Sequence, residues 1–444
     1  MINPDKLRNV TVLGAAGKMG SGILLLTAVE ITDLSLQPEN KNLDFVVNAI
    51  DVSSFSLKGV MKYIKNQVIK IAEKKIIDLR KWYAQRDDLV ENGEIIEQYV
   101  SDVLATIRTS TRIESAYNST LIFEAIKEDP NLKSRIFKEI DDASQSNPWF
   151  FTNTSSIPIA ELETRSKIEG RIIGFHFYNP PAVQKLVEII KTKQTQPEVA
   201  EFALEFARKL GKVIVESNDF AGFIGNGHFM RDLLYGIKQA EILSAQIGFT
   251  QAIVAVNSIT ADYLIRPMGI FQLTDYVGID VCSFILQVMN SFHHDDLHSN
   301  LLDSLIDLNI KGGQHPDGSQ KDGFFKYLFG KIDAVYDYKS ENYIKIADTL
   351  PAVQKFLETD TTHFPVWKSV IKNKDKQQTL ATHFKLLNAS ESTGNKLAIK
   401  YLQNSKDIGL QLIAEGVANN ATDVNTVMLT GFFHAYGPIH NFFE

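Results

Sequence analysis

The chain has 444 residues, 44% of them hydrophobic and 22% charged, which is typical of a globular protein with two or three domains. Its formal net charge of −7 argues against nucleic acid or an anionic membrane as a partner, although a local lysine patch can still receive phosphates. A single cysteine, Cys282, excludes an internal disulfide, and the sequence has neither a signal-peptide pattern nor an apolar run long enough to span a bilayer. We therefore expect a cytoplasmic protein with no membrane partner.

A glycine-rich loop follows the first predicted strand, Val10–Leu13, and precedes a segment with helical character, Ser21–Val29. The loop residues that we expect at a bound ligand are Gly14, Gly17, Lys18, Met19 and Gly20. Strand, glycine loop and helix together aim backbone N–H groups and a helix N-terminus at a pyrophosphate. Glycines in such a turn can also serve packing alone, so a second observation is needed to decide for a dinucleotide.

That second observation is Asp51, which ends the next predicted strand, Phe45–Ile50. A carboxylate there can accept hydrogen bonds from the adenosine ribose and repels a 2′-phosphate, so NAD is favoured over NADP. The gap between Gly20 and Asp51 is longer than the usual length of about 20 residues, and we interpret Thr32–Leu43 as a polar insertion. The alternative is that Asp51 is an ordinary cap of the following helix.

The segment Arg171–Ile190 carries the residues that favour acid–base chemistry. His176 lies in a strand-like apolar run, and Glu188 lies in the next apolar run. A carboxylate beside a neutral histidine fixes the tautomer, orients the ring and stabilises the imidazolium, which makes the histidine a poised base. The alternatives are a core histidine with satisfied hydrogen bonds and a surface ion pair of Glu188 with Lys185 or Lys191.

The order of predicted elements divides the chain. Strands and helices alternate over residues 1–216, as in a doubly wound, Rossmann-like α/β sheet that binds NAD. Glu216–Asp219 marks a boundary, and residues 217–330 form an all-α domain in this prediction. The run His293–His298 has side chains that can bind a metal ion, but without a regular site spacing we expect no metal.

Six blocks of the sequence resemble the 3-hydroxyacyl-CoA dehydrogenase family, which is NAD-dependent, acts in β-oxidation and includes 3-hydroxybutyryl-CoA dehydrogenases. The blocks are the glycine loop, Phe123–Asp129, Thr152–Ser156, Gly174–Pro180, Gly222–Asn226 and Arg266–Gly278. They occur in the family's order and with similar spacing. The resemblance implies an oxidoreductase that reversibly transfers a hydride from the 3-hydroxyl carbon of a 3-hydroxyacyl-CoA to NAD, in fatty acid β-oxidation or short-chain acyl-CoA metabolism.

The resemblance also implies roles for single residues. His176 matches the family's catalytic base, and Glu188 matches its acidic partner. Ser155 matches a hydroxyl that meets both substrate and nicotinamide, and Asn226 matches an amide that holds the substrate oxygens. The residues that match the lining of the NAD site are Asp51, Glu128, Lys133, Ser155 and Asn179.

Two of these residues have simpler interpretations. Ser155 and its neighbour Ser156 have the chemistry to cap a helix that starts near Pro158. Asn226 follows glycines and is also typical of a turn or a cap. These interpretations stay open at this point, and the structural role and the functional role of the serine turn can coexist.

The sequence departs from the family in two places. The glycine loop has two residues between its first two glycines where the family usually has one, so we expect a wider pyrophosphate turn. The family's CoA-contacting lysine matches Lys74 at the ungapped spacing, with Lys70 and Lys75 as the other candidates. These lysines are equally typical of a solvated helix face.

The last segment, residues 331–444, weakly repeats the order of motifs in the second domain. Some family members carry a second copy of the helical domain, and this segment resembles a degenerate copy. We therefore expect either a homodimer or an intrachain pseudo-dimer. The segment has no second His/Glu pair, so we expect no second active site.

Two other functional classes compete with this prediction. One is a dehydrogenase of a free hydroxy acid or sugar acid on the same scaffold. The other is a non-catalytic NAD-binding protein, for which the widened glycine loop is the supporting feature.

Overall fold

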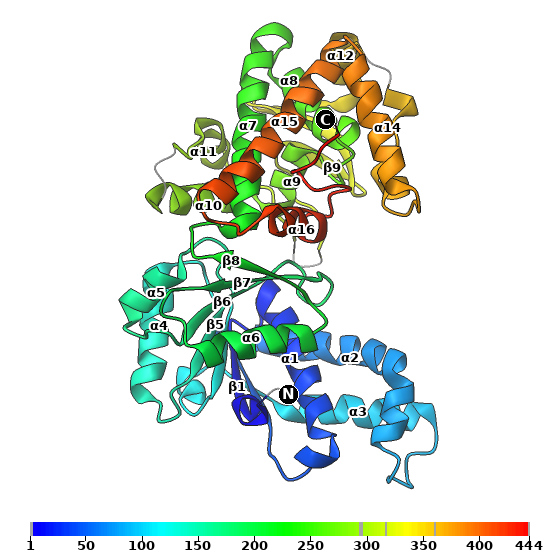
Figure 1. Ribbon diagram of the computed structural model, residues 1–444. Helices are drawn as coiled ribbons and strands as arrows, with labels where there is room; N and C mark the ends of the chain where they lie inside the picture. The colour runs from blue at the N-terminus through cyan, green and yellow to red at the C-terminus, as the bar shows by residue number, and fades with distance from the viewer. Residues whose placement is uncertain (1–2, 293–295, 316–317, 359–360, 443–444) are drawn as a thin grey trace. The chain divides into compact units, whose positions relative to one another are not determined.

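The computed structural model describes residues 3–292, 296–315, 318–358 and 361–442 (Figure 1). The chain forms two compact units, one ending at Asp219 and the other beginning at Phe220. Among the described residues, no helix combines the length and the apolar character that crossing a membrane requires.

The first unit is built on an eight-stranded sheet with the order β3-β2-β1-β4-β5-β6-β7-β8. The strands are β1 (Asn9–Leu13), β2 (Val46–Ile50), β3 (Ile107–Ser110), β4 (Leu121–Glu124), β5 (Trp149–Thr152), β6 (Ile172–Phe177), β7 (Leu186–Lys191) and β8 (Val213–Asn218). β1 to β6 are parallel to one another, and β7 and β8 run in the opposite direction. The strand order reverses between β1 and β4, which is where open α/β sheets bind their ligands. The predicted Rossmann-like fold class is confirmed.

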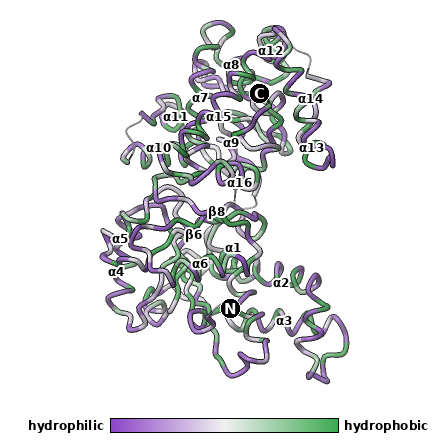
Figure 2. The backbone as a smooth tube through the Cα atoms, viewed as in Figure 1, coloured by the Kyte–Doolittle hydropathy of each residue, from purple (hydrophilic) through white to green (hydrophobic). Residues whose placement is uncertain are grey.

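Six helices accompany this sheet: α1 (Lys18–Ser35), α2 (Ser54–Trp82), α3 (Asn92–Thr106), α4 (Pro130–Ala143), α5 (Ile159–Ser166) and α6 (Pro197–Lys209). Figure 1 shows α2 and α3 lying side by side. Along α2, hydrophobic and hydrophilic residues alternate (Figure 2), with buried side chains such as Val60, Ile64 and Val68 every three or four positions. This is the spacing of a helix with one buried face.

The prediction of a polar insertion over Thr32–Leu43 is wrong in its first part. α1 continues to Ser35, and the side chain of Thr32 is buried and donates to the carbonyl oxygen of Ala28 at 2.8 Å. The helix continues because neither glycine nor proline occurs between Gly22 and Pro38, and because Thr32 satisfies its hydroxyl within the helix.

Aromatic side chains on three adjacent strands form the core beside the predicted base. The rings of Phe123 and Phe151 lie 5.5 Å apart, and those of Phe151 and Phe175 lie 5.3 Å apart. Side chains alternate between the two faces of a strand, so His176 points to the opposite face from Phe175. The packed phenylalanines therefore fix the strand whose other face carries the histidine.

The second unit is mainly helical. Its helices are α7 (Phe223–Ile247), α8 (Phe249–Ser258), α9 (Ile270–Val277), α10 (Ile279–Phe292), α11 (Asn300–Asp307), α12 (Ile346–Leu357), α13 (Trp367–Val370), α14 (Lys376–Ala389), α15 (Thr393–Ala414) and α16 (Ala421–Gly431). It also contains an antiparallel sheet, β11-β10-β9, that the sequence analysis did not anticipate. Its strands are β9 (Phe325–Leu328), β10 (Lys331–Asp337) and β11 (Asn342–Lys345). The boundary that we placed at residue 330 lies in the turn between β9 and β10.

The end of the chain packs onto α7 through buried polar contacts. Tyr401 of α15 donates its hydroxyl to the carbonyl oxygen of Asp232 at 2.8 Å. Arg266 forms an ion pair with Asp232 at 2.6 Å and donates to Ser405 at 3.1 Å. Asp232, Arg266, Tyr401 and Ser405 are all buried, so α7 and α15 share one interior.

Candidate active site

The glycine loop is closed tightly against the ends of two strands. The backbone N–H groups of Gly14 and Ala15 both donate to the carbonyl oxygen of Ile50, at 2.9 and 3.0 Å. Gly14 has a φ of +75°, and a Cβ added there would lie 2.5 Å from the carbonyl oxygen of Ala125. A Cβ added at Gly20 would lie only 2.0 Å from the Gly14 oxygen. Both positions therefore require glycine, and α1 lies directly against the loop.

The first turn of α1 suits an anion. The helix begins at Lys18 after Gly17, which supplies no side-chain cap, and the first turn contains no acidic residue. The first N–H groups of a helix have no partner within it, and they attract phosphates. The predicted loop residues, including Met19, thus lie where a pyrophosphate would bind.

Asp51 is half-buried at the end of β2 and holds the loop. Its Oδ2 accepts a hydrogen bond from the backbone N–H of Ala16 at 3.0 Å, and its Oδ1 accepts one from that of Ser53 at 3.4 Å. The N-cap of α2 is Ser53, whose hydroxyl accepts a hydrogen bond from the N–H of Ser56. The alternative of Asp51 as the helix cap is therefore not what the structure shows.

His176 and Glu188 lie directly opposite each other on the antiparallel strands β6 and β7. Their Nδ1 and Oε1 atoms are 3.3 Å apart, and Glu188 is fully buried. The Lys191 ammonium pairs instead with Glu216 on β8. A surface ion pair of Glu188 is therefore wrong, because cross-strand pairing places its carboxylate against the imidazole.

Tyr178 joins this pair and was missed in the sequence. Its hydroxyl donates to the same Oε1 of Glu188 at 2.6 Å, and its ring centroid lies 4.8 Å from that of His176. Burial and the Glu188 charge raise the pKa of Tyr178 well above its usual value, so the phenol keeps its proton. The sequence did contain a signal for this contact. Tyr178 lies two positions after His176, and side chains two positions apart in a strand lie on the same face.

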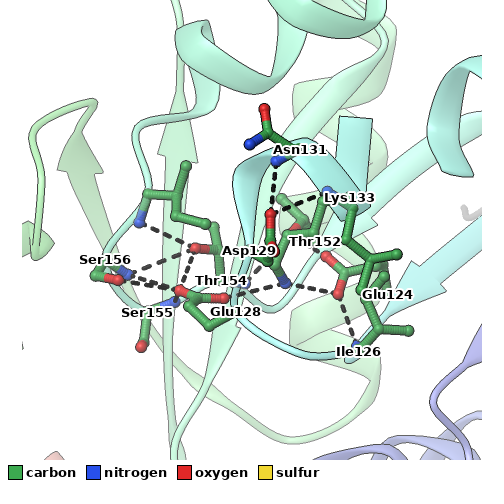
Figure 3. A network of polar contacts seen from close by, with 12 residues as sticks. Glu124, Ile126, Glu128, Asp129, Asn131, Lys133, Thr152, Thr154, Ser155 and Ser156 are labelled. Atoms are coloured by element: carbon green, nitrogen blue, oxygen red, sulfur yellow. Dashed lines mark hydrogen bonds and ion pairs between the residues drawn. The ribbon is translucent and has the colours of Figure 1, made fainter. Parts of the chain in front are cut away.

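Glu128 holds the Thr-Ser-Ser turn, as Figure 3 shows. Its Oε1 accepts hydrogen bonds from the Thr154 hydroxyl at 2.6 Å and from the backbone N–H groups of Ser155 and Ser156 at 3.0 and 3.2 Å. The Ser156 hydroxyl donates to the same oxygen at 3.1 Å. The Glu128 carboxylate therefore contacts all three residues of the turn, including the half-buried Ser155.

Lys133 is buried between two carboxylates (Figure 3). Its Nζ lies 2.6 Å from Oε1 of Glu124 and 3.1 Å from Oε2 of Glu128. Burial opposes both charges, but their mutual attraction prevails, so the pKa of Lys133 is raised and the pKa of Glu128 is lowered. Glu124, which the sequence analysis did not single out, also accepts a hydrogen bond from Thr152 at 2.5 Å.

The serine turn does not cap α5. That helix begins at Ile159, and its first N–H groups, those of Ile159 and Ala160, donate to the two carboxylate oxygens of Asp219 at 2.6 and 2.8 Å. The capping alternative for Ser155 and Ser156 is therefore wrong, because Asp219 takes that role from far along the chain.

Asn179 lies in the loop between β6 and β7. Its Oδ1 is buried and has no hydrogen-bond partner among the residues that the structure describes. The loop is held by Lys212, whose Nζ donates to the carbonyl oxygens of Pro181 and Gln184 at 2.6 and 2.7 Å. Pro181 lies so close to α1 that a Cβ added at Gly22 would be 2.8 Å from its ring. A buried acceptor beside α1 fits a bound NAD molecule.

The remaining predicted residues lie elsewhere. Asn226 is half-buried in α7 of the second unit, after the N-cap Gly222, so it is neither a cap nor a turn residue. Lys74 is exposed on α2, whereas Lys75 pairs with Asp33. In the run His293–His298, where we expect no metal, His293, His294 and Asp295 lie outside the described residues. Among the residues that the structure describes, no three ligand side chains are grouped as a metal site requires.

Residues 9–220 match the family model of the 3-hydroxyacyl-CoA dehydrogenase NAD binding domain, and residues 246–326 match that of the C-terminal domain. The human mitochondrial hydroxyacyl-coenzyme A dehydrogenase is 31% identical over 323 residues, which are 72% of this chain and 91% of the relative. A probable 3-hydroxybutyryl-CoA dehydrogenase of Bacillus subtilis is 32% identical over 286 residues, covering 64% of this chain and 86% of the relative.

Solved structures show the same fold. The crystal structure of 3-hydroxybutyryl-CoA dehydrogenase from Escherichia coli superimposes with a TM-score of 0.63 at 21% identity, covering 98% of this chain and 90% of the other. The structure of FadB2 from M. tuberculosis gives a TM-score of 0.55 at 26% identity, covering 73% of this chain and 100% of the other.

Proposed function

The chain belongs to the 3-hydroxyacyl-CoA dehydrogenase family of NAD-dependent oxidoreductases, and we propose that its substrate is a 3-hydroxyacyl-CoA, oxidised reversibly to the 3-oxoacyl-CoA. The observation that carries this proposal is the His176–Glu188 pair, with 3.3 Å between Nδ1 and Oε1, on the same sheet as the glycine loop. We place the reaction in fatty acid β-oxidation or short-chain acyl-CoA metabolism.

The chain's own residues fit NAD. When bound, NAD accepts the hydride that leaves C3 of the substrate. The first turn of α1 would hold the pyrophosphate, and Asp51 would accept hydrogen bonds from the adenosine ribose. Asn179 contributes its buried acceptor, and Glu128 and Lys133 would line the nicotinamide side of the site.

His176 would accept the proton of the 3-hydroxyl group. Its Nδ1 faces Glu188, and we propose that Nε2 accepts the proton. The Glu188 carboxylate holds the ring in that orientation and stabilises the imidazolium that forms. Because the carboxylate is fully buried, it interacts with the ring rather than with water.

Donors are needed for the oxygens of the substrate. We propose that the Ser155 hydroxyl and the Asn226 amide donate to the developing carbonyl and to the thioester oxygen. Glu128 fixes the Ser155 backbone for this role. Lys74 on α2 remains our proposal for the contact with CoA.

The test measures NADH formation, through its near-ultraviolet absorbance, with 3-hydroxybutyryl-CoA, with a longer 3-hydroxyacyl-CoA and with free 3-hydroxybutyrate. Turnover of the thioesters only, lost in His176→Gln, supports the proposal. Activity on the free acid would assign a hydroxy-acid dehydrogenase instead. Absence of turnover with measurable NAD binding would assign a non-catalytic role.

We also propose that residues 331–444 form a degenerate second copy of the helical domain, making an intrachain pseudo-dimer. The buried contacts of Tyr401 and Ser405 with α7 and Arg266 support it.

We propose a reducing compartment such as the cytoplasm. The chain's single cysteine, Cys282, is buried as a free thiol, which fits such a compartment.

A further inference from the structure

Two donors share one oxygen atom in the first unit. The Oε1 atom of Glu188 lies 2.6 Å from the Tyr178 hydroxyl and 3.3 Å from Nδ1 of His176. The shorter contact is the one to the tyrosine. The strongest interaction of Glu188 in this trio is therefore not with the predicted base.

The chain geometry explains why this contact exists. Tyr178 follows the last residue of β6, and it lies two positions after His176, so both rings are on the same face. Their centroids are 4.8 Å apart and their planes are inclined by 43°. The tyrosine ring thus packs against the imidazole while its hydroxyl reaches past it to the carboxylate.

We propose that Tyr178 is a positioning residue that holds the carboxylate of Glu188 in place and limits the basicity of His176. This inference rests on the proposed function, in which His176 is the base. A hydrogen bond donated to a carboxylate stabilises its anion and draws charge away from its other partner. The imidazolium of His176 is then stabilised less than it would be by Glu188 alone.

Other charged groups near this trio are engaged elsewhere. On β7, the remaining titratable residue is Lys191, which pairs with Glu216 of β8. β5 carries no titratable side chain. Glu188 is a charged group that contacts both His176 and Tyr178.

Two helices, α5 and α6, pack on β6, and their charged residues either pair with groups outside this trio or lie at the surface. In α5, Arg165 pairs with Glu161, and Glu163 accepts a hydrogen bond from the N–H of Gly170. The charged residues of α6 lie on its exposed or half-exposed side: Glu198, Glu201, Glu205, Arg208 and Lys209.

The substitution Tyr178→Phe tests the proposal because it removes the hydroxyl and keeps the ring. We expect the acid limb of the kcat/KM profile for thioester oxidation to move up by about half to one pH unit, since the histidine becomes more basic. Below that limb, kcat/KM falls about three- to tenfold, and at high pH it is unchanged or higher. If the substitution only disturbed the local structure, kcat/KM would fall at every pH and the position of the acid limb would not change.

Two matched variants complete the design. Tyr117→Phe removes a hydroxyl that donates to the exposed Glu139, and it should leave the profile unchanged. In a Glu188→Gln background, Tyr178→Phe should cause no further movement of the limb, because the shared carboxylate is gone.

A second readout does not depend on turnover. Carbon-13 labelled histidine allows the titration of His176 to be followed by NMR, with His176→Gln assigning its signal. We expect the titration midpoint to rise in Tyr178→Phe. An unmoved midpoint would overturn the proposal while leaving the dehydrogenase assignment intact. A raised midpoint in a protein that oxidises no thioester would refute the proposed function instead.

Discussion

The backbone N–H of Ala16 donates to Oδ2 of Asp51 at 3.0 Å. Ala16 is one of the two residues between the first two glycines of the loop, so the widened turn is fastened to the end of β2. The carboxylate that we assign to the ribose therefore also shapes the turn that we assign to the pyrophosphate. Two parts of the cofactor site depend on one side chain.

This double role predicts different outcomes for two substitutions. Asp51→Asn keeps an acceptor for Ala16 and removes the negative charge, so NADP should bind better while NAD loses little. Asp51→Ala removes the acceptor too, and NAD should bind about ten- to a hundredfold more weakly, as for the loss of a hydrogen bond to a charged group. Fluorescence titration of each variant with NADH and with NADPH measures these affinities. Equal losses in the two variants would show that the loop does not depend on Asp51.

Replacing the predicted base should affect the rate and not the affinity for NAD. Because glutamine cannot take a proton, His176→Gln should lower kcat by about a hundred- to ten-thousandfold. The dissociation constant of NAD should remain within error of the wild type. His298→Gln is a matched control, since His298 pairs with Asp303 at 2.8 Å on the exposed surface of the other unit. A similar loss in both variants would point to a general effect on folding.

Glu128→Gln should destabilise the first unit in a pH-dependent way. The pKa of Glu128 is lowered from its usual 4.5, because its interactions with Lys133 and the serine turn outweigh burial. Its stabilisation is therefore present above pH 4.5 and is lost as the pH falls through the lower, folded pKa. The free energy of unfolding should fall by about 1–3 kcal/mol at neutral pH, and the difference should shrink in acid.

Urea unfolding at several pH values measures this difference. Glu114→Gln, at an exposed ion pair with Arg112, serves as the control and should change stability little. A difference for Glu128→Gln that grows in acid would contradict the sign of the predicted linkage.

The packing of α15 on α7 predicts a monomer in solution. If Tyr401 and its neighbours already cover α7, the same chain occupies the face of α7 that a second chain would otherwise use. Sedimentation equilibrium should give a mass near 49.8 kDa that does not change with concentration. A stable dimer of the full chain would refute the pseudo-dimer.

The sequence predicted the first unit better than the second for physical reasons. Buried parallel strands and a glycine loop leave strong local patterns, so β1 and β2 were predicted, as was the place of Asp51 at the end of β2. The strands of the sheet over Phe325–Lys345 are partly exposed, and Lys326 and Lys331 weaken their apolar pattern. Such strands are set by tertiary contacts rather than by their own residues.

The same distinction applies within the site. The pairing of His176 and Glu188 was predicted because each lies in an apolar run, where burying a polar or charged side chain costs free energy unless it has a partner. In the sequence, Tyr178 resembles the other aromatic residues of the strand. Its role depends on the contact of its hydroxyl with Glu188, which only the structure shows. Asp219 caps α5 through a contact between residues about 60 positions apart, which no local pattern reveals.

The enclosure of Lys133 also has a chemical consequence. An unprotonated lysine amine attacks thioesters and condenses with ketones, and the proposed reaction brings both groups to this unit. Glu124 and Glu128 keep the Lys133 ammonium protonated, and a protonated amine has no lone pair to react. The two carboxylates thus keep this buried amine in its unreactive, protonated form.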